Sequence, residues 1–244
     1  MAGVVAACRS CAYVREVIVV DDGSTDDTAE RALAAGAKVL RLPVRAPAGS
    51  AASPGSPATA TSVGPRGSVG PPGSAASPRS VGSKALAMEA GVELSDADAI
   101  LFVDADLRGI TGAHLDDICR PYLEGRAAMS LGVFDYGIWN PLVLRFPPTS
   151  GERILPRWVF EAVPPAKRDG YLIEIMLNEV VTEARMPCTA RVMRGVTHRT
   201  KREKFGWREG YRRTWAMFRS LWALWGVCRK RTYWFYLKDL TIER

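Results

Sequence analysis

The sequence of 244 residues lacks the marks of a membrane-spanning or secreted protein. It contains no uninterrupted apolar run of about 18 residues, so we expect no membrane-spanning helix. Its first residues, MAGVVAACRSCAYV, have neither the basic start nor the long apolar centre of a signal peptide. Apolar residues make up 47% of the chain, enough for a sizeable core. We therefore expect a folded cytoplasmic protein.

Histidine is scarce, and the five cysteines do not form a repeated motif. Cys8 and Cys11 form a single C-x-x-C, a spacing that can mark a redox or zinc site. No second pair follows, and only His114 and His198 are available as further ligands. On a helix the same spacing places both thiols on one face, so buried thiols are the favoured interpretation.

Residues 43–83 lack acidic and aromatic side chains altogether. These 41 residues contain eight prolines, seven glycines and nine serines. Such a segment buries too little apolar surface to offset its conformational entropy, which predicts a disordered insertion. The insertion separates an amino-terminal part, residues 1–42, from a second part, residues 84–205, and a carboxyl-terminal tail follows at residues 206–244.

The net charge of +7 comes from the end of the chain. From Arg199 onward there are thirteen lysines and arginines but only four acids. This distribution favours phosphate groups or an anionic membrane face as partners. No nucleic-acid-binding motif accompanies it, so we expect no nucleic acid.

Strand patterns and helix patterns alternate along the chain, which predicts an α/β fold with a mainly parallel sheet. The predicted strands are 16–22, 38–42, 98–107, 127–134 and 188–196. The predicted helices are 3–14, 23–37 (capped by Ser24 or Thr25), 84–95, 112–120, 154–163 and 170–184.

Two predicted strands run directly into pairs of carboxylates. Asp21 and Asp22 end one strand, and Asp104 and Asp106 end another. Ligands bind beyond the carboxyl ends of parallel strands, so both pairs are expected to face one crevice. The i, i+2 spacing lets Asp104 and Asp106 approach one hard cation, Mg²⁺ or Mn²⁺. Turn formation and helix capping by aspartate are the alternative, but two such strand ends favour a site.

These motifs resemble the GT-A nucleotide-sugar glycosyltransferases of the family 2 type. The resemblance rests on EVIVVDDGSTDDTAERA, on Lys84 before ALAMEAG, and on ILFVDADL. It implies a Rossmann-like, mixed but mainly parallel sheet flanked by helices. It also implies that Asp21 and Asp22 hold the base and ribose of a UDP- or GDP-sugar. The D-x-D aspartates would carry the metal on the diphosphate, with Asp106 close to the reaction.

Segments in the second half resemble glucosyl-3-phosphoglycerate synthases, in the same order: SGERILPR, VFEAVP, GYLIEIMLN and GVTHRTK. SGERILPR equally resembles the S-G-x-R segment of dolichol- and polyprenyl-phosphate sugar transferases. By this likeness Glu174 contacts the sugar or acts near the attacking hydroxyl, and His198 is the third metal ligand. Arg199 and Lys201 would contact phosphates.

The same likeness suggests an acceptor site and a role for Lys84. Ser150, Gly151 and Arg153 would bind a phosphate-bearing acceptor, either phosphoglycerate-like or a polyprenyl phosphate. A surface ion pair with Glu152 is the alternative for Arg153. Lys84 would meet the ribose or a phosphate of the donor, and a solvated helix start is the alternative. The sequence leaves open whether the chain forms a homodimer.

The sequence departs from the family pattern at its start. Family members begin with a strand and a P-x-Y-N-E-like loop, whereas this chain begins at the helix that follows. That strand normally lies between the strands predicted at 16–22 and 98–107. We therefore expect either a gap in the sheet or altered pairing there. The alternative function is a truncated, inactive remnant that binds a membrane or a partner.

The tail carries an aromatic stripe at helical spacing, formed by Trp215, Phe218, Trp222 and Trp225. Basic residues surround the stripe, so the pattern predicts an amphipathic helix. Such a helix suits peripheral contact with the inner face of a membrane. Packing of the aromatic side chains against the domain is the equally favoured alternative.

Overall fold

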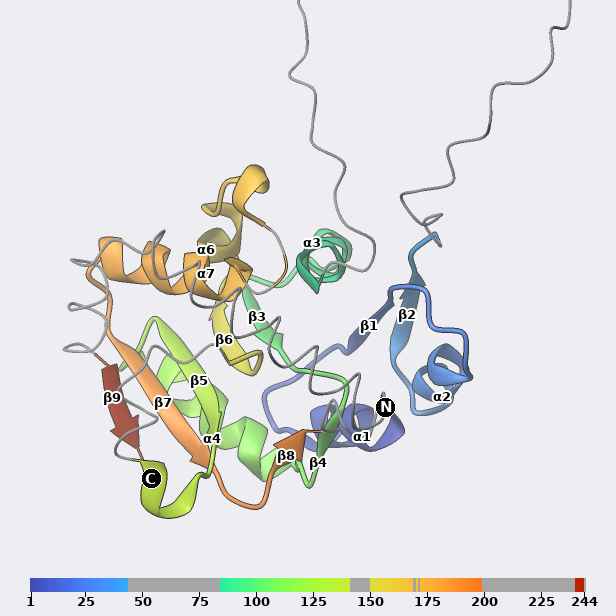
Figure 1. Ribbon diagram of the computed structural model, residues 1–244, viewed down its shortest axis with the longest axis horizontal. Helices are drawn as coiled ribbons and strands as arrows, with labels where there is room; N and C mark the ends of the chain where they lie inside the picture. The colour runs from blue at the N-terminus through green and yellow to red at the C-terminus, as the bar shows by residue number, and fades with distance from the viewer. Residues whose placement is uncertain (44–83, 141–149, 169, 171, 199–239, 244) are drawn as a thin grey trace, which may run out of the picture.

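The computed structural model describes residues 1–43, 84–140, 150–168, 170, 172–198 and 240–243 (Figure 1). The predicted insertion, apart from Pro43, lies outside these residues. So do Arg199, Lys201 and the aromatic stripe of the tail. No described helix is long and apolar enough to span a membrane.

Helices and strands alternate as expected for an α/β protein. The helices are α1 (Ala2–Ser10), α2 (Thr28–Ala34), α3 (Lys84–Leu94), α4 (Gly112–Leu123), α6 (Arg157–Glu161) and α7 (Leu172–Glu183), with short 3-10 turns η1 (Gly137–Trp139) and η2 (Pro165–Lys167). The strands are β1 (Ile18–Asp21), β2 (Lys38–Arg41), β3 (Ala99–Phe102), β4 (Leu107–Arg108), β5 (Met129–Phe134), β6 (Arg153–Pro156), β7 (Cys188–Met193), β8 (Thr197–His198) and β9 (Leu240–Glu243).

A five-stranded mixed sheet forms the centre of the fold, with the order β3-β6-β5-β7-β9. The β5-β7 and β7-β9 pairs are parallel, whereas β6 is antiparallel to both of its neighbours. Helices cover both faces. One apolar cluster joins α3, α6 and α7 to the sheet, and a second joins α1 and α4 to it. The predicted fold class is confirmed.

The first two strands form a separate parallel pair, β1-β2. Figure 1 shows this pair beside β3 but apart from it, with α1 and α3 close by. Among the described strands, β1 pairs only with β2, and β3 pairs only with β6. Of the two expectations for this region, a gap in the sheet is the one observed.

Helix α4 continues beyond its predicted end at Arg120 and includes Pro121. A proline inside a helix removes the hydrogen bond to the carbonyl four residues earlier, here that of Asp117. Arg191 replaces it, because its Nε donates to the Asp117 carbonyl at 3.2 Å. The proline is therefore tolerated through a tertiary contact that the local sequence does not encode.

Three other local predictions were wrong. The helix predicted at 154–163 begins only at Arg157, because the preceding residues form β6 inside the sheet. Helix α2 begins at Thr28, and the backbone N–H of Ser24 instead donates to Asp21 Oδ1 at 2.9 Å. The chain end predicted as helical tail forms β9 at residues 240–243, where it gains main-chain pairing with β7.

The cysteine prediction is confirmed for the four described thiols. Cys8, Cys11, Cys119 and Cys188 are all buried thiols rather than disulfides. Burial raises the pKa of Cys8 to about 11 and that of Cys119 to about 12. These thiols are therefore protonated and inert near neutral pH.

Candidate active site

The first acidic strand end is organised by its own backbone. Asp21 is buried as the last residue of β1, and its carboxylate accepts the Ser24 N–H at 2.9 Å. Asp22 is exposed beside it. Asp21 therefore shapes the turn after β1, while Asp22 is accessible to a ligand.

The second acidic strand end lies in a cluster of charged side chains. Lys84, the first residue of α3, contacts Asp104 Oδ1 and Glu174 Oε1, each at 2.7 Å from its Nζ. Asp104 is 38% exposed, whereas Glu174, in the first turn of α7, is only 2% exposed. Three segments far apart in the sequence thus meet at one point.

The charges of this cluster are strongly coupled. Burial alone would lower the pKa of Lys84, but the charges of Glu174 and Asp104 outweigh it and raise the pKa above the ordinary lysine value. Lys84 is therefore cationic. The second oxygen of Glu174, Oε2, is buried and accepts no hydrogen bond from the residues that the structure describes. A buried carboxylate oxygen without a donor is costly, and a ligand hydroxyl would satisfy it.

Gly151 allows this cluster to form. The β3-β6 register, extended beyond the paired residues, places Gly151 opposite Asp104. A Cβ at residue 151 would lie 2.4 Å from Asp104 Oδ1 and 2.5 Å from Oδ2. Glycine is therefore the residue that leaves room for the Asp104 carboxylate.

A second buried carboxylate, Glu152, lies directly behind Asp104. The Ser150 hydroxyl lies 2.7 Å from Glu152 Oε2 and also contacts the Gly132 carbonyl. Burial, followed by the charge of Asp104, raises the pKa of Glu152 to about 7. One hydroxyl hydrogen cannot serve two acceptors. A protonated Glu152 resolves this by donating to Ser150 Oγ, while the Ser150 hydroxyl donates to Gly132.

Arg153 is completely buried and fully engaged with the protein. Its Nε and one terminal nitrogen donate to the Ser150 carbonyl at 2.9 and 2.5 Å. The other terminal nitrogen donates to the Glu174 carbonyl at 3.1 Å and to Asn178 Oδ1 at 3.0 Å. Arg153 therefore fixes α7, and with it Glu174, against the start of β6.

This geometry shows how the fold uses the three predicted acceptor residues. Ser150, Gly151 and Arg153 are all buried, because the strand that they introduce lies inside the sheet. The guanidinium of Arg153 faces backbone carbonyls rather than solvent. It is also not the surface ion pair with Glu152 that was the alternative. Their predicted role in binding an acceptor stays a prediction.

A short ladder places His198 beside the strand that follows Asp106. Strands β4 and β8 are antiparallel, and Leu107, the residue after Asp106, pairs with His198. The two connecting turns touch, since a Cβ at Gly109 would lie 2.5 Å from the Gly195 carbonyl oxygen. The His198 ring is exposed and lies 5.3 Å from the ring of Phe134. The role of His198 as the third metal ligand stays a prediction.

The side-chain chemistry of Asp104, Asp106 and His198 fits a hard divalent cation, although the three side chains do not lie close together in this structure. No group of three histidine, cysteine or acidic side chains within the described ranges is close enough to hold a metal. Asp104 instead engages the Lys84 ammonium. Carboxylate oxygens with one imidazole are chemically suited to Mg²⁺ or Mn²⁺. The other histidine, His114, is used structurally, as the partner of Thr111 in the capping box of α4.

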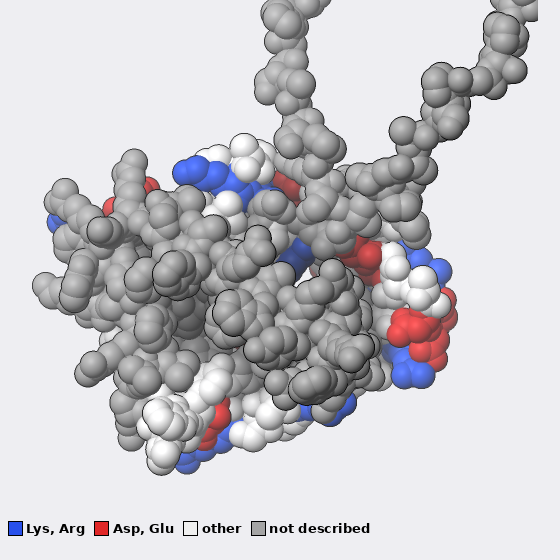
Figure 2. Space-filling model, viewed as in Figure 1, with Lys and Arg blue, Asp and Glu red and all other residues white. Residues whose placement is uncertain are grey.

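Surface charges near the amino-terminal strands are mixed rather than of one sign. Figure 2 shows acidic and basic side chains side by side over α2 and β2. Ion pairs account for this, including Arg31 with Asp27, Arg41 with Glu30, and Lys38 with Glu16. In the candidate site, by contrast, the three acidic side chains of Asp104, Glu152 and Glu174 lie near one lysine, Lys84.

Comparison with solved structures identifies the fold. Glucosyl-3-phosphoglycerate synthase from Mycobacterium tuberculosis, in complex with Mn²⁺, UDP-glucose and phosphoglyceric acid, matches with a TM-score of 0.53 and 22% identity, over 80% of this chain and 66% of that one. Its complex with Mg²⁺ and UDP matches with a TM-score of 0.54 and 21% identity, over the same shares. The fold is that of glucosyl-3-phosphoglycerate synthase. The predicted GT-A fold is confirmed.

These comparisons leave the activity to be argued from the site. The chain spans 66% of the length of the synthase structures, and at this identity the likeness shows the fold alone. No family model and no curated protein matches the chain. The resemblance to dolichol- and polyprenyl-phosphate sugar transferases stays a prediction.

Two site residues were missed by sequence reasoning. Glu152 was considered only as a surface partner for Arg153, and Asn178 was not considered. The sequence did contain a signal for them. An acid and an arginine directly precede the apolar pair Ile154–Leu155 of a strand, where charged side chains need partners inside the protein.

Proposed function

We propose that the chain is a metal-dependent glycosyltransferase that moves a sugar from a UDP-sugar to a phosphate-bearing acceptor. The observation that carries this proposal is the meeting of Asp104, Lys84 and Glu174 at the end of β3. It supports the proposal because the fold is one whose solved examples hold UDP-glucose and a divalent metal. A GDP-sugar is the alternative donor.

At the donor end, Asp104, Asp106 and His198 would hold Mg²⁺ or Mn²⁺. The metal would neutralise charge on the diphosphate leaving group. A cation bound at Asp104 replaces one partner of Lys84, whose ammonium is then available to a phosphate oxygen. Asp22, which is exposed beside the turn that Asp21 shapes, is proposed to meet the nucleoside. Arg199 and Lys201, outside the described residues, are proposed to contact the diphosphate.

At the sugar, Glu174 is the proposed contact. Its Oε2 is buried and has no donor within the described part of the chain, so a sugar hydroxyl is a suitable partner. The acceptor oxygen would form the new bond to the anomeric carbon as the bond to the diphosphate breaks. A phosphoglycerate-like acceptor is the first choice, and a polyprenyl phosphate is the second. Arg153 supports this step by holding α7 in place.

The first experiment measures thermal stability with UDP, with and without Mn²⁺. We expect UDP to raise the melting temperature only when Mn²⁺ is present, because the metal bridges protein and diphosphate. Asp106→Ala should abolish this increase. Asp27→Ala, which removes an exposed acid paired with Arg31 on α2, should retain it. A folded protein with no metal-dependent increase for UDP or GDP would contradict the proposal.

The second experiment measures sugar transfer directly. Purified protein, UDP-glucose and Mn²⁺ are incubated with 3-phosphoglycerate or with a polyprenyl phosphate, and the glucosylated product is measured. Product with one acceptor assigns the acceptor class. Binding of UDP without transfer to either would support a nucleotide-binding remnant instead.

A further inference from the structure

Two turns next to the short β4-β8 ladder are held against each other by their backbones. One turn, residues 109–111, leads from β4 to α4, and the other, residues 194–196, leads from β7 to β8. Strand β4 follows the D-x-D aspartates, β8 contains His198, and Figure 1 shows the two strands side by side. The D-x-D segment and His198 are far apart in the sequence, so their relative position depends on how these two turns meet.

The first contact between the turns is made by two glycines. A Cβ at Gly109 would lie 2.5 Å from the carbonyl oxygen of Gly195, a backbone atom that cannot move aside as the end of a flexible side chain can. Both glycines have a positive φ, 76° for Gly109 and 74° for Gly195, which other residues rarely adopt. At Gly195, however, a Cβ would meet nothing. Gly109 is therefore needed both for its backbone conformation and for the close approach.

The second contact is made by His114, in the first turn of α4. Its Nε2 lies 3.2 Å from the carbonyl oxygen of Arg194, and a carbonyl can only accept, so Nε2 carries the hydrogen and donates. Its Nδ1 accepts the backbone N–H of Thr111 at 3.2 Å. One imidazole thus joins the end of the first turn to the beginning of the second.

The capping of α4 does not by itself require a histidine. A capping box needs an acceptor three residues after the N-cap, which glutamate or glutamine commonly supplies. The Nδ1 of His114 serves this purpose, whereas its Nε2 is directed to a different segment of the chain. The donor at the far end of the ring is explained by the second turn.

Both turns are anchored in one apolar cluster. Leu107 and Ile110 on one side, and Met193 and Val196 on the other, are buried in the cluster that joins α1 and α4 to the sheet. From this anchor the β4-β8 ladder extends to the pair of Leu107 with His198. A displacement of one turn against the other would therefore move His198 relative to the D-x-D segment.

We propose that Gly109 and His114 are positioning residues of the metal site, which hold the two turns together so that β8 presents His198 to the D-x-D segment. This inference rests on the proposed function, in which Asp106 and His198 are ligands of one cation. With the turns fixed, the approach of these ligands is limited to short movements, and less conformational entropy is lost when the cation binds. Gly109 and His114 act through His198 and do not contact the cation.

The matched variants Gly109→Ala and Gly195→Ala test the contact between the turns. Both replace a glycine of nearly the same positive φ, so both carry similar backbone strain. Only Gly109→Ala adds a methyl group against the opposite turn. Mn²⁺ affinity of the full chain is measured in the presence of UDP by electron paramagnetic resonance. We expect it to fall about tenfold or more in Gly109→Ala and less than about threefold in Gly195→Ala.

The matched variants His114→Gln and His114→Glu test the hydrogen bond to Arg194. Both side chains keep an acceptor for the Thr111 N–H, so both keep the capping box of α4. Glutamine also keeps a donor, whereas glutamate has none. We expect His114→Gln to stay within about threefold of the parent in Mn²⁺ affinity, and His114→Glu to lose about tenfold. Similar melting temperatures without metal would show that both variants fold.

A second readout follows the position of His198 without the metal. The His198 ring lies 5.3 Å from the Phe134 ring, close enough for nuclear Overhauser effects between them. These effects should weaken in Gly109→Ala and His114→Glu and persist in Gly195→Ala and His114→Gln. This pattern, together with the matching losses of Mn²⁺ affinity, would support the positioning role.

Three results would overturn it. Equal losses of affinity in both members of either pair would show that backbone strain or helix capping is responsible. Unchanged affinity in Gly109→Ala and His114→Glu would show that neither residue positions the site, whether or not the Overhauser effects weaken. If the parent itself binds no Mn²⁺ with UDP, the proposed function fails, and this inference fails with it.

Discussion

Lys84 holds two carboxylates at once, those of Asp104 and Glu174, and this arrangement can be tested by stability. In Lys84→Met, Glu174 is left buried without its cation, so the free energy of unfolding should fall by about 3 kcal/mol. Urea denaturation measures this. The double variant Lys84→Met/Glu174→Gln should recover most of the loss, because no charge is stranded. If the double variant loses as much as both single changes together, Lys84 acts through packing alone.

Glu152 should make stability depend on pH. Its pKa is raised from 4.5 to about 7, first by burial and then by Asp104, while Lys84 opposes the shift. Between these values the folded protein binds more protons than the unfolded chain. The contribution of Glu152 is therefore fully present below about pH 4.5 and is lost as pH rises to about 7.

The variant Glu152→Gln isolates this effect. Glutamine cannot ionise, so the variant should exceed the parent in stability above pH 7 by up to about 3 kcal/mol. Denaturation at a series of pH values measures the difference. Glu161→Gln, at an exposed position on α6, should follow the parent curve. If the stability of Glu152→Gln depends on pH in the same way as that of the parent, Glu152 is not the group responsible.

At the scale of elements, the pairing of β3 with β6 sets the geometry of the site. Gly151→Ala would bring a methyl group within 2.5 Å of the Asp104 carboxylate and displace it from Lys84. We expect the Mn²⁺-dependent stabilisation by UDP to be lost, while the free energy of unfolding falls by only about 1–3 kcal/mol. Calorimetry with and without Mn²⁺ and UDP measures both the stabilisation and the free energy of unfolding. Gly3→Ala on α1, where a Cβ meets nothing, should leave the Mn²⁺-dependent stabilisation intact and raise the free energy of unfolding by at most about 1 kcal/mol.

Elements with a strong local pattern were predictable from the sequence. The strands β1, β2, β5 and β7 and the helices α3 and α7 follow their apolar periodicity closely. Pro121 and β6 were not predictable in the same way. The proline is tolerated because of Arg191, which is distant in sequence, and residues 153–156 form a strand because β3 and β5 flank them. Tertiary pairing decides both cases.

The candidate site was predictable in part. Spacing and resemblance selected Asp104, Lys84, Glu174 and His198, and the fold places the first three in contact. The burial of Arg153 was not predictable, since it depends on β6 being an interior strand. A motif shows which side chains are present, but not which of them point into the core and which point toward solvent.

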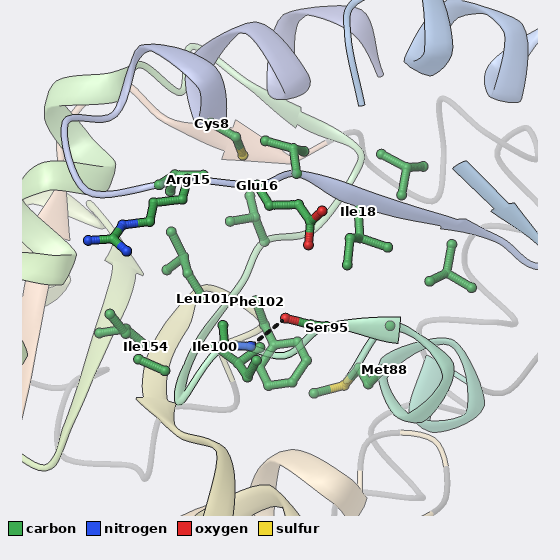
Figure 3. Close-up of a pocket in the computed structure, with 18 of the residues that line it drawn as sticks. Cys8, Arg15, Glu16, Ile18, Met88, Ser95, Ile100, Leu101, Phe102 and Ile154 are labelled. Carbon is green, nitrogen blue, oxygen red and sulfur yellow. Dashed lines mark hydrogen bonds between the residues drawn. The ribbon is translucent and has the colours of Figure 1, made fainter. Parts of the chain in front are cut away.

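At the scale of the whole molecule, the gap between β1 and β3 (Figure 3) divides the strands into two unequal groups. Residues 1–43 contact the rest of the described chain mainly through α1 on α4 and through β1 on α3, and no described strand pairs across the gap. We expect the amides of β1 and β2 to exchange through openings of lower free energy than those of β5 and β7. Native-state hydrogen exchange in low denaturant measures this. A single free energy for all four strands would show that the two parts unfold as one unit.

The two contacts of Arg191 bear on the order in which the molecule assembles. The same guanidinium satisfies the carbonyl freed by Pro121 and pairs with Glu243 of β9 at 3.1 Å. Both contacts need β7 in its place in the sheet, so we expect them to form after β5 and β7 have paired. Weakening Arg191 should therefore accelerate unfolding while leaving the refolding rate nearly unchanged. The Arg191 guanidinium would thus contribute kinetic stability: it slows unfolding without changing the rate of folding.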